Sequence, residues 1–205
     1  MMAQSADDAE RSRFASLLMR DVDRLERLVS GVRDLARIDG QLESEPQDAI
    51  DLHALADEVV GGLRLGARDA DRISVRHAGR APALVRGSRE RLAQVLENLI
   101  TNALSFTAPG TSVSVTVEED DGHCVATVAD SGPGIPEEHL ERIFDRFFTY
   151  RPVEGRREHL GLGLAIARTI VESYDGSIAA SNRPEGGAAF EVRLHRSHRA
   201  VPQSV

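Results

Sequence analysis

Residues 112–134 read SVSVTVEEDDGHCVATVADSGPG, and this stretch decides the fold class. Valines at positions 113, 115 and 117 alternate with polar residues, which is the pattern of a strand with one buried side. A second strand pattern runs from His123 to Asp130, after the turn Asp120-Asp121-Gly122. Two such runs joined by a glycine-containing turn predict a β-hairpin. We interpret the four consecutive acids at 118–121 as a solvated loop tip.

Helical patterns lie on both sides of this hairpin. Apolar residues recur at helical spacing over residues 52–65, 89–106 and 162–174, and a short helix is expected after Pro136. Asp51 and Ser88 are candidate N-caps for the first two helices. Short strands are expected at residues 73–75, 83–85, 177–180 and 188–194. Helices interleaved with mostly hairpin-connected strands predict an α/β fold, arranged as a two-layer α/β sandwich.

A long helix is predicted ahead of this pattern, over about residues 9–39. Its apolar residues recur every three or four positions, at Leu18, Val22, Leu25, Val29, Val32 and Ala36. Such spacing makes a narrow seam that packs on another helix. The helix either packs on its own domain or forms a dimerisation or hairpin arm. The second interpretation is preferred because the helix precedes the globular pattern, and polar residues 39–48 read as a linker.

Composition excludes several classes of protein. The 205 residues are 41% hydrophobic and 28% charged, as expected for a globular chain. The net charge of −8 argues against a nucleic-acid-binding protein, and no apolar run is long enough for a membrane span. All 25 basic residues are arginine, so chemistry that needs a lysine amine is excluded. The single cysteine, Cys124, permits no internal disulfide.

Four short segments are candidates for chemistry. Asn98 and Asn102 lie four residues apart on a predicted helix, so their carboxamides share one face. Residues 130–134 (DSGPG) follow a strand, 161–163 (GLG) begin a helix, and Gly186-Gly187 precedes the last strand. Each segment alone is more often a turn, a cap or polar surface. Their combination and order indicate one site.

In that order and spacing, the segments resemble the catalytic and ATP-binding domain of sensor histidine kinases, within the Bergerat-type ATPase and kinase superfamily. The resemblance covers about residues 50–195. It rests on an asparagine box at 94–103 (QVLENLITNA), a phenylalanine box at 143–148 (IFDRFF) and glycine boxes at 130–136, 161–166 and 186–190. It implies a mixed, mostly antiparallel sheet with helices on one face. Residues 23–38 resemble the second helix of the family's dimerisation hairpin.

The resemblance also implies domain boundaries and a ligand. Residues 1–45 would be a partial dimerisation hairpin with its linker, 46–200 the catalytic ATP-binding domain and 201–205 a tail. ATP and Mg²⁺ would be the cofactors. The predicted nucleotide-binding residues are Asn98, Asn102, Ser105, Phe106, Asp130, Gly132, Gly134, Ile135, Arg146, Arg151, Gly161, Leu162, Gly163 and Leu164.

Individual roles follow from the chemistry of these residues. The Asp130 carboxylate can accept a hydrogen bond from the exocyclic amine of adenine, and Gly132 and Gly134 leave room for the base. The family's magnesium ligand matches Asn102, whose side-chain oxygen suits that hard cation. Asn98 and Arg146 are the predicted catalytic residues, with Arg146 a candidate for charge on the γ-phosphate. The helix that begins near Gly161 would direct its N-terminus at the phosphates.

Some positions depart from the family pattern. The family often has a basic residue where Ser105 stands, Phe106 keeps an aromatic ring without the hydroxyl, and His159 replaces a frequent glycine. Residues 149–160 resemble the mobile lid over the nucleotide. Its arginines either reach phosphate or are ordinary surface charge; they are Arg151, Arg156 and Arg157. The three aromatic residues of the phenylalanine box are expected to pack the base of this lid into the core.

None of the seven histidines lies in the setting of the family's phosphoacceptor, a histidine followed by an acid and then a proline. Either the sequence begins midway through the hairpin, which is the preferred interpretation, or the protein acts on a histidine of another chain. The expected partners are ATP, a phosphoacceptor helix, a response regulator and a second copy of this chain, bound through the N-terminal helix. We expect a cytoplasmic location, either free or as the cytoplasmic part of a membrane-bound sensor.

The leading functional hypothesis is transfer of the γ-phosphoryl group of Mg-ATP to a histidine. A hydrolase is disfavoured because Asn98 stands where the related ATPases typically carry a water-activating glutamate, and an amide cannot act as a general base. The main alternative is a catalytically weak ATP-binding regulatory module that lacks its own phosphoacceptor. A third possibility is an anti-sigma-type serine kinase, which would not need the leading helix.

Overall fold

A computed structural model describes residues 47–66, 72–78, 82–108, 110–150 and 161–197, together with Phe14, Met19 and Val22, which are helical and exposed. The rest of the predicted N-terminal helix and the tail at 201–205 lie outside the described residues. So do Arg151, Arg156, Arg157 and His159 of the predicted lid. The proposed domain boundaries therefore stay predictions.

The described chain is built on a five-stranded sheet, in the order β2-β4-β5-β7-β6. The strands are β2 (Ile73–His77), β4 (Val113–Asp120), β5 (His123–Ala129), β6 (Ser177–Asn182) and β7 (Ala188–His195). Only β2 and β4 pair in parallel, and the other three pairings are antiparallel. The predicted mixed, mostly antiparallel sheet is therefore confirmed.

The β4–β5 hairpin closes as the sequence indicates. Asp121 and Gly122 both have positive φ angles, 42° and 78°, and they join strands that pair up to Asp120 and His123. A two-residue Asp-Gly turn of this kind matches the right-handed twist of the strands. The acids at its tip are not simply solvated, because Arg193 pairs with Asp120 at 2.7 Å and Arg196 with Glu119 at 2.9 Å.

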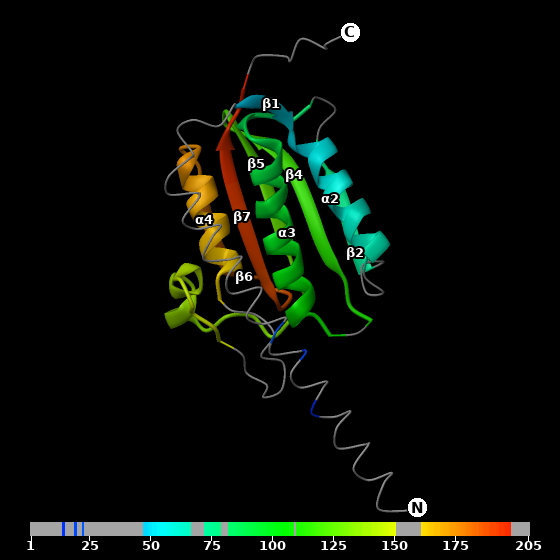
Figure 1. Cartoon of the computed structure of the whole chain (residues 1–205), viewed down its shortest axis with the longest axis vertical. Coiled ribbons are helices and arrows are strands. Elements are labelled where there is room, and N and C mark those ends of the chain that lie inside the picture. The colour runs from blue at the N-terminus through cyan, green and yellow to red at the C-terminus, as the bar shows by residue number, and fades with distance from the viewer. Residues whose placement is uncertain are drawn as a thin grey trace, which may run out of the picture.

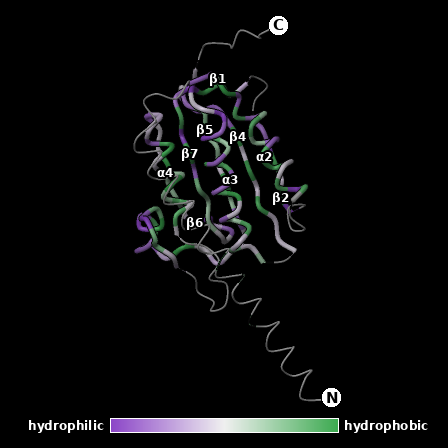
Figure 2. The backbone as a smooth tube through the Cα atoms, in the orientation of Figure 1, coloured by the Kyte–Doolittle hydropathy of each residue, from purple (hydrophilic) through white to green (hydrophobic). Residues whose placement is uncertain are grey.

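Three helices cover one face of the sheet (Figure 1). They are α2 (Leu52–Gly66), α3 (Arg89–Phe106) and α4 (Gly163–Ser173). Hydrophobic and hydrophilic residues are interspersed along helices and strands alike, as elements with one buried side require (Figure 2). The buried side of α3 consists of Leu92, Val95, Leu96, Leu99, Ile100 and Ala103. No helix in the described ranges is both long and apolar enough to cross a membrane.

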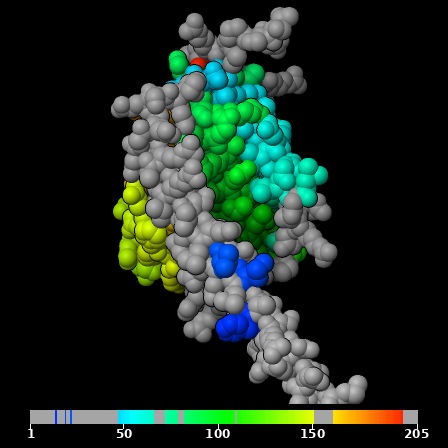
Figure 3. Space-filling model, in the orientation of Figure 1, coloured from blue at the N-terminus to red at the C-terminus, as the bar shows by residue number. Residues whose placement is uncertain are grey.

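The outer surfaces of α2 (cyan) and α3 (green) lie side by side on the visible face of the molecule, and the segment around residues 137–150 (yellow-green) lies at the lower left of the view (Figure 3). That segment contains two 3₁₀ turns, η2 (Glu137–His139) and η3 (Arg142–Phe144). The short helix expected after Pro136 is thus two separate turns. On α2, a Cβ added to Gly61 or Gly62 would meet open space, with no atom of the described residues within 4 Å.

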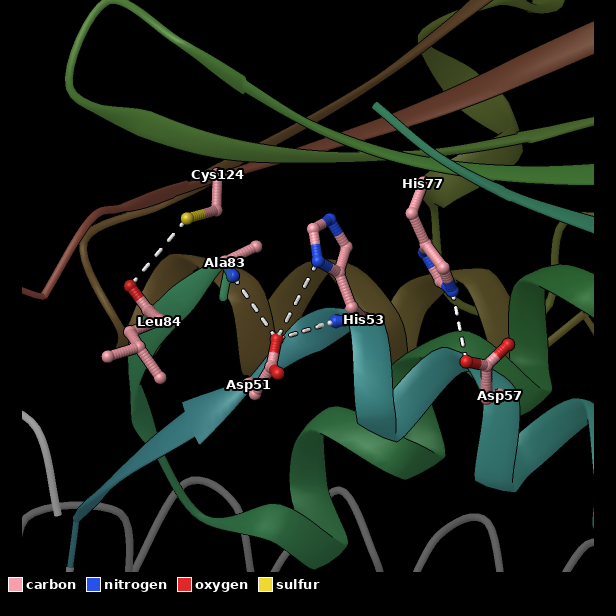
Figure 4. Close-up of polar contacts among 7 residues, drawn as sticks. All are labelled: Asp51, His53, Asp57, His77, Ala83, Leu84 and Cys124. Carbon is pink, nitrogen blue, oxygen red and sulfur yellow. Dashed lines mark hydrogen bonds and ion pairs between the residues drawn. The ribbon is translucent and has the colours of Figure 1, made fainter. Parts of the chain in front are cut away.

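One of the two predicted helix caps is correct. The Asp51 carboxylate accepts hydrogen bonds from the backbone amides of His53 at 3.0 Å and Ala83 at 3.1 Å, so it caps α2 and ties it to the next segment (Figure 4). Ser88 occupies the N-cap position of α3, but its hydroxyl donates to the Glu90 carboxylate at 3.0 Å and makes no cap hydrogen bond. The backbone amide of Glu90, and then the hydrogen bond from the Ser88 hydroxyl, lower the pKa of the Glu90 carboxyl.

A second, two-stranded sheet lies at one end of the domain. Strand β1 (Asp48–Asp51) pairs antiparallel with β3 (Leu84–Gly87), which corresponds to the strand expected at 83–85. The sequence pattern predicts a linker up to residue 48 and only a helix cap at Asp51, so it misses β1. Only Ile50 of its four residues is buried, so the segment has no alternating pattern to distinguish it from a polar linker.

Candidate nucleotide-binding site

The asparagine box places two carboxamides on α3, one turn apart. Asn98 faces the beginning of α4, because a Cβ added to Gly163 would lie 3.5 Å from Asn98 Oδ1. The Asn98 Nδ2 atom is buried and has no hydrogen-bond partner among the residues that the structure describes. A buried donor without a partner costs about 1–3 kcal/mol, so this position favours a bound polar group. Asn102 is half-buried on the following turn.

Asp130 lies directly after the end of β5 and is 3% exposed. Its Oδ1 atom accepts hydrogen bonds from the backbone amides of Gly132 at 2.8 Å and Ala188 at 3.1 Å. The other carboxylate oxygen, Oδ2, makes no hydrogen bond with any residue in the described ranges. The carboxylate is therefore held through one oxygen while the second can accept a hydrogen bond from a ligand.

Glycines bring the end of α3 and two loops together around Asp130. A Cβ on Gly132 would lie 2.9 Å from the Phe106 carbonyl oxygen, so the loop after β5 packs on the last residue of α3. Gly187 has a φ of +87°, and its Cβ would lie 2.7 Å from the carbonyl carbon of Asp130. No larger residue fits either approach without displacing the loop that follows β5.

The N-terminus of α4 meets the phenylalanine box. Gly161, with a φ of +68°, accepts a hydrogen bond from the Phe147 amide at 2.9 Å, and its Cβ position is blocked by Phe148. Leu162 is buried at the N-cap position and provides no side-chain cap, so within the described ranges no side chain caps the first-turn amides of α4, which suit an anion. Leu164 is half-buried and packs against the core.

The phenylalanine box only partly matches the expectation. Phe144 is buried and meets Phe190 edge to face, and Phe148 is half-buried against the core. Phe147 is 58% exposed and has a positive φ of 65°, so the prediction that it packs into the core is wrong. Arg146 is exposed just beyond η3.

The structure therefore brings several of the predicted residues into contact, at α3 and at the loop that follows β5. Asn98 meets Gly163, Phe106 meets Gly132, and Asp130 meets the third glycine box. Ser105 is part-buried and donates its hydroxyl to the Asn102 backbone carbonyl at 2.7 Å. The geometry does not establish phosphate roles for Arg146 or for Arg151, which lies outside the described ranges.

Two residues in contact with this site were not predicted. The Asn182 carboxamide accepts a hydrogen bond from the Ile135 amide at 2.8 Å and donates one to the Ile135 carbonyl at 2.6 Å. Arg183 Nη1 donates to the Asp130 carbonyl at 2.8 Å. Because these contacts join residues 47 and 53 positions apart, no local pattern in the sequence could reveal them.

A separate cluster of titratable groups lies toward the β1 end of the domain, away from η2 and η3 (Figures 1 and 4). The rings of His53 and His77 are 4.5 Å apart, and His77 Nε2 lies 3.0 Å from an Asp57 carboxylate oxygen. Within the described ranges, no group of three or more histidine, cysteine or acidic side chains could hold a metal ion. A metal ion at the nucleotide site would therefore need other oxygen ligands than a cluster of this kind.

Comparison with known proteins agrees with this geometry. A family model described as "Histidine kinase-, DNA gyrase B-, and HSP90-like ATPase" matches residues 87–198. The sensor protein ChvG of Agrobacterium fabrum is 33% identical over 94% of this chain, and the sensor-like histidine kinase SenX3 of Mycolicibacterium smegmatis is 30% identical over 93%. The chain spans about a third of ChvG and half of SenX3, at 35% and 50% of their lengths.

Solved structures give the same result. The mycobacterial sensor histidine kinase MprB aligns with a TM-score of 0.64 and 27% identity, over 74% of this chain and 98% of that one. Full-length ShkA in complex with AMPPNP aligns with a TM-score of 0.74 and 26% identity, over 93% of this chain and 40% of that one.

The fold and the site define an ATP-binding α/β domain of the kinase and ATPase type. The chain belongs to the histidine kinase-, DNA gyrase B- and HSP90-like ATPase family, and it contains an ATP-binding catalytic domain of the type found in sensor histidine kinases.

Proposed function

We propose that this chain transfers the γ-phosphoryl group of Mg-ATP to a histidine that is not among the seven in its sequence, within a two-component signalling pathway. The observation that carries the proposal is the state of Asp130, whose buried carboxylate has one oxygen held by two backbone amides and the other available. That oxygen suits the exocyclic amine of adenine, which is a donor where guanine has an acceptor.

The residue at position 98 favours transfer over hydrolysis. Asn98 lies against the N-terminus of α4, next to the helix amides proposed to hold the phosphates. Its carboxamide can donate to or accept from a ligand, but it cannot remove a proton from water at neutral pH. In the proposed reaction, a histidine nitrogen attacks the γ-phosphorus, the bond to the β–γ bridging oxygen breaks, and ADP leaves.

Mg²⁺ fits the proposed site through Asn102. The side-chain oxygen of Asn102 is the kind of hard ligand that Mg²⁺ prefers. One turn earlier, the buried Asn98 amide has no hydrogen-bond partner in the described ranges, which supports a polar ligand on this face of α3. When bound, Mg²⁺ neutralises charge on the phosphate oxygens. Because the described residues offer no acidic cluster, the nucleotide itself and water would supply the remaining ligands.

Arg146 and Arg151 are proposed phosphate contacts, and they stay predictions. The chain contains no lysine, so any permanently charged side-chain cation that it supplies to the γ-phosphate must be an arginine. Homodimerisation through residues 23–38 and docking of a response regulator are likewise proposed from the family resemblance.

Phosphotransfer to a separately supplied acceptor tests the proposed function. The chain is incubated with γ-labelled ATP, Mg²⁺ and a helical hairpin that carries an acceptor histidine. Label on the hairpin that is stable in alkali and labile in acid supports a histidine kinase. ATP binding without transfer to any acceptor supports the alternative, a catalytically weak ATP-binding module, which the replacement of the family's basic residue by Ser105 favours.

The magnesium assignment predicts a specific defect for Asn102→Ala. The variant should bind ATP in EDTA as the wild type does, but it should lose the gain in affinity that Mg²⁺ gives. Isothermal titration with and without Mg²⁺ measures both quantities. Thr101→Ala, an exposed neighbour on α3, is the matched control. An Asn102→Ala variant that keeps the full Mg²⁺ effect would contradict the assignment.

A further inference from the structure

The loop that follows β5 is held at both ends by a single turn. This loop runs from Asp130 to Ile135, and the turn that joins β6 to β7 holds it through residues 182–188. Both segments lie at the same end of the sheet (Figure 1). β5 stops at Ala129, so residues 131–135 have no strand partner to satisfy their backbone groups within the described part of the chain.

Asn182 acts at the far end of the loop. Its carboxamide pairs with the Ile135 peptide through both a donor and an acceptor, as a neighbouring strand would. The approach depends on a glycine, because a Cβ on Gly134 would lie 2.8 Å from Asn182 Oδ1. Gly134 also has a φ of +78°, which a side chain would make costly.

The near end of the loop is held by the other residues of the same turn. Arg183 donates to the Asp130 carbonyl, and the Ala188 amide donates to the Asp130 carboxylate. Arg183 also meets Glu185 at 3.7 Å, which keeps the guanidinium over the turn. Position and orientation of the Asp130 carboxylate therefore depend on a turn more than fifty residues further along the chain.

We infer that Asn182 and Arg183 are positioning residues for adenine recognition. They fix the span from Asp130 to Ile135, and through it the direction in which Asp130 presents its available oxygen. The inference rests on the proposed ATP-binding role of Asp130. Neither side chain belongs to the hydrophobic core, and Asn182 is exposed, so their contribution is to the shape of the loop rather than to the stability of the sheet.

An analogue of ATP provides the test. Purine riboside triphosphate lacks the exocyclic amine, so it cannot donate to Asp130. Kd values for ATP and for this analogue are measured by titration calorimetry on the full chain. Wild type, Asn182→Ala and Ser181→Ala are compared; Ser181 is the exposed neighbour on β6 and is not among the residues that bridge to the loop.

Asn182→Ala should weaken ATP binding about tenfold and analogue binding by much less, because loss of two hydrogen bonds frees the loop that orients Asp130. Ser181→Ala should match the wild type. An Asn182→Ala variant that binds ATP as tightly as the wild type, or that loses ATP and analogue affinity equally, would overturn the inference. A wild type that binds neither nucleotide would instead reject the proposed function.

Arg183→Ala provides a second, independent variant, and it keeps the test decisive if Asn182→Ala does not fold. It removes the donor to the Asp130 carbonyl and leaves the Asn182 pairing intact. The same selective loss of ATP affinity, about fivefold, is expected. Equal affinity of Arg183→Ala and the wild type for ATP would contradict the role of Arg183.

Discussion

Asp130 should have two separable functions, one in folding and one in recognition. In Asp130→Ala, the amides of Gly132 and Ala188 both lose their acceptor. The Ala188 amide belongs to a residue that is only 3% exposed, so water cannot readily replace the carboxylate. An unsatisfied buried amide costs about 1–3 kcal/mol, and the two together should lower the free energy of unfolding by about 3 kcal/mol.

Asp130→Asn separates the two functions. Its carbonyl oxygen can still accept from both amides, so the free energy of unfolding should fall by only about 1 kcal/mol, which reflects the weaker hydrogen bonds of a neutral acceptor. Its amino group, however, would face the adenine amine as a second donor. ATP binding should therefore be lost in both variants although only Asp130→Ala is strongly destabilised.

Urea unfolding followed by circular dichroism gives the free energies, and titration calorimetry gives the ATP affinities. If Asp130→Asn binds ATP as the wild type does, the available oxygen has no role in recognition. If Asp130→Ala is as stable as Asp130→Asn, the two backbone amides do not depend on the carboxylate.

Two further predictions concern stability and reactivity. Gly61→Ala should raise the free energy of unfolding by about 0.5–1 kcal/mol, because the added Cβ meets open space on α2. Gly176→Ala should lower the free energy of unfolding in the same urea experiment, because its Cβ would lie 2.6 Å from the Arg193 carbonyl oxygen. Burial, and then the charge of Glu119, raises the pKa of the Cys124 thiol to about 11. At pH 8 only about 0.1% of the Cys124 thiol is then thiolate, so iodoacetamide should react at least about tenfold more slowly with the native than with the urea-unfolded protein. Fast labelling of the native protein would contradict the burial of Cys124.

Local patterns in the sequence were sufficient for the main elements. The bounds of α3 match the prediction at both ends, because six buried residues recur at helical spacing between Arg89 and Phe106. The β4–β5 hairpin was equally clear, since both the alternation and the Asp-Gly turn are local signals. Among the glycine boxes, Gly132, Gly161 and Gly187 lie where an added Cβ would meet backbone atoms, which leaves glycine as the only choice there; the nucleotide role of the boxes stays a prediction.

Features that depend on distant residues could not be predicted in this way. Strand β1 exists because Ile50 pairs with Val85, a residue far along the chain, and not because its own four residues favour a strand. Asn182 and Arg183 lie in a segment that reads as an ordinary turn before Gly186-Gly187. Their hydrogen bonds to Ile135 and Asp130 are visible only once the sheet brings the segments together.

Strand β3 has a mechanical consequence for the domain. It pairs with β1 on one side, where the chain enters the described domain. It also contacts the segment where that domain ends, through the Val85–Arg196 bridge and the hydrogen bond from the Ser197 amide to the Leu84 carbonyl. Entry and exit therefore share one short strand. Tension on either flanking segment would therefore reach β3 first, and on the exit side it is shared with the β4–β5 turn, because the Arg196 amide donates to the Gly122 carbonyl at 2.9 Å.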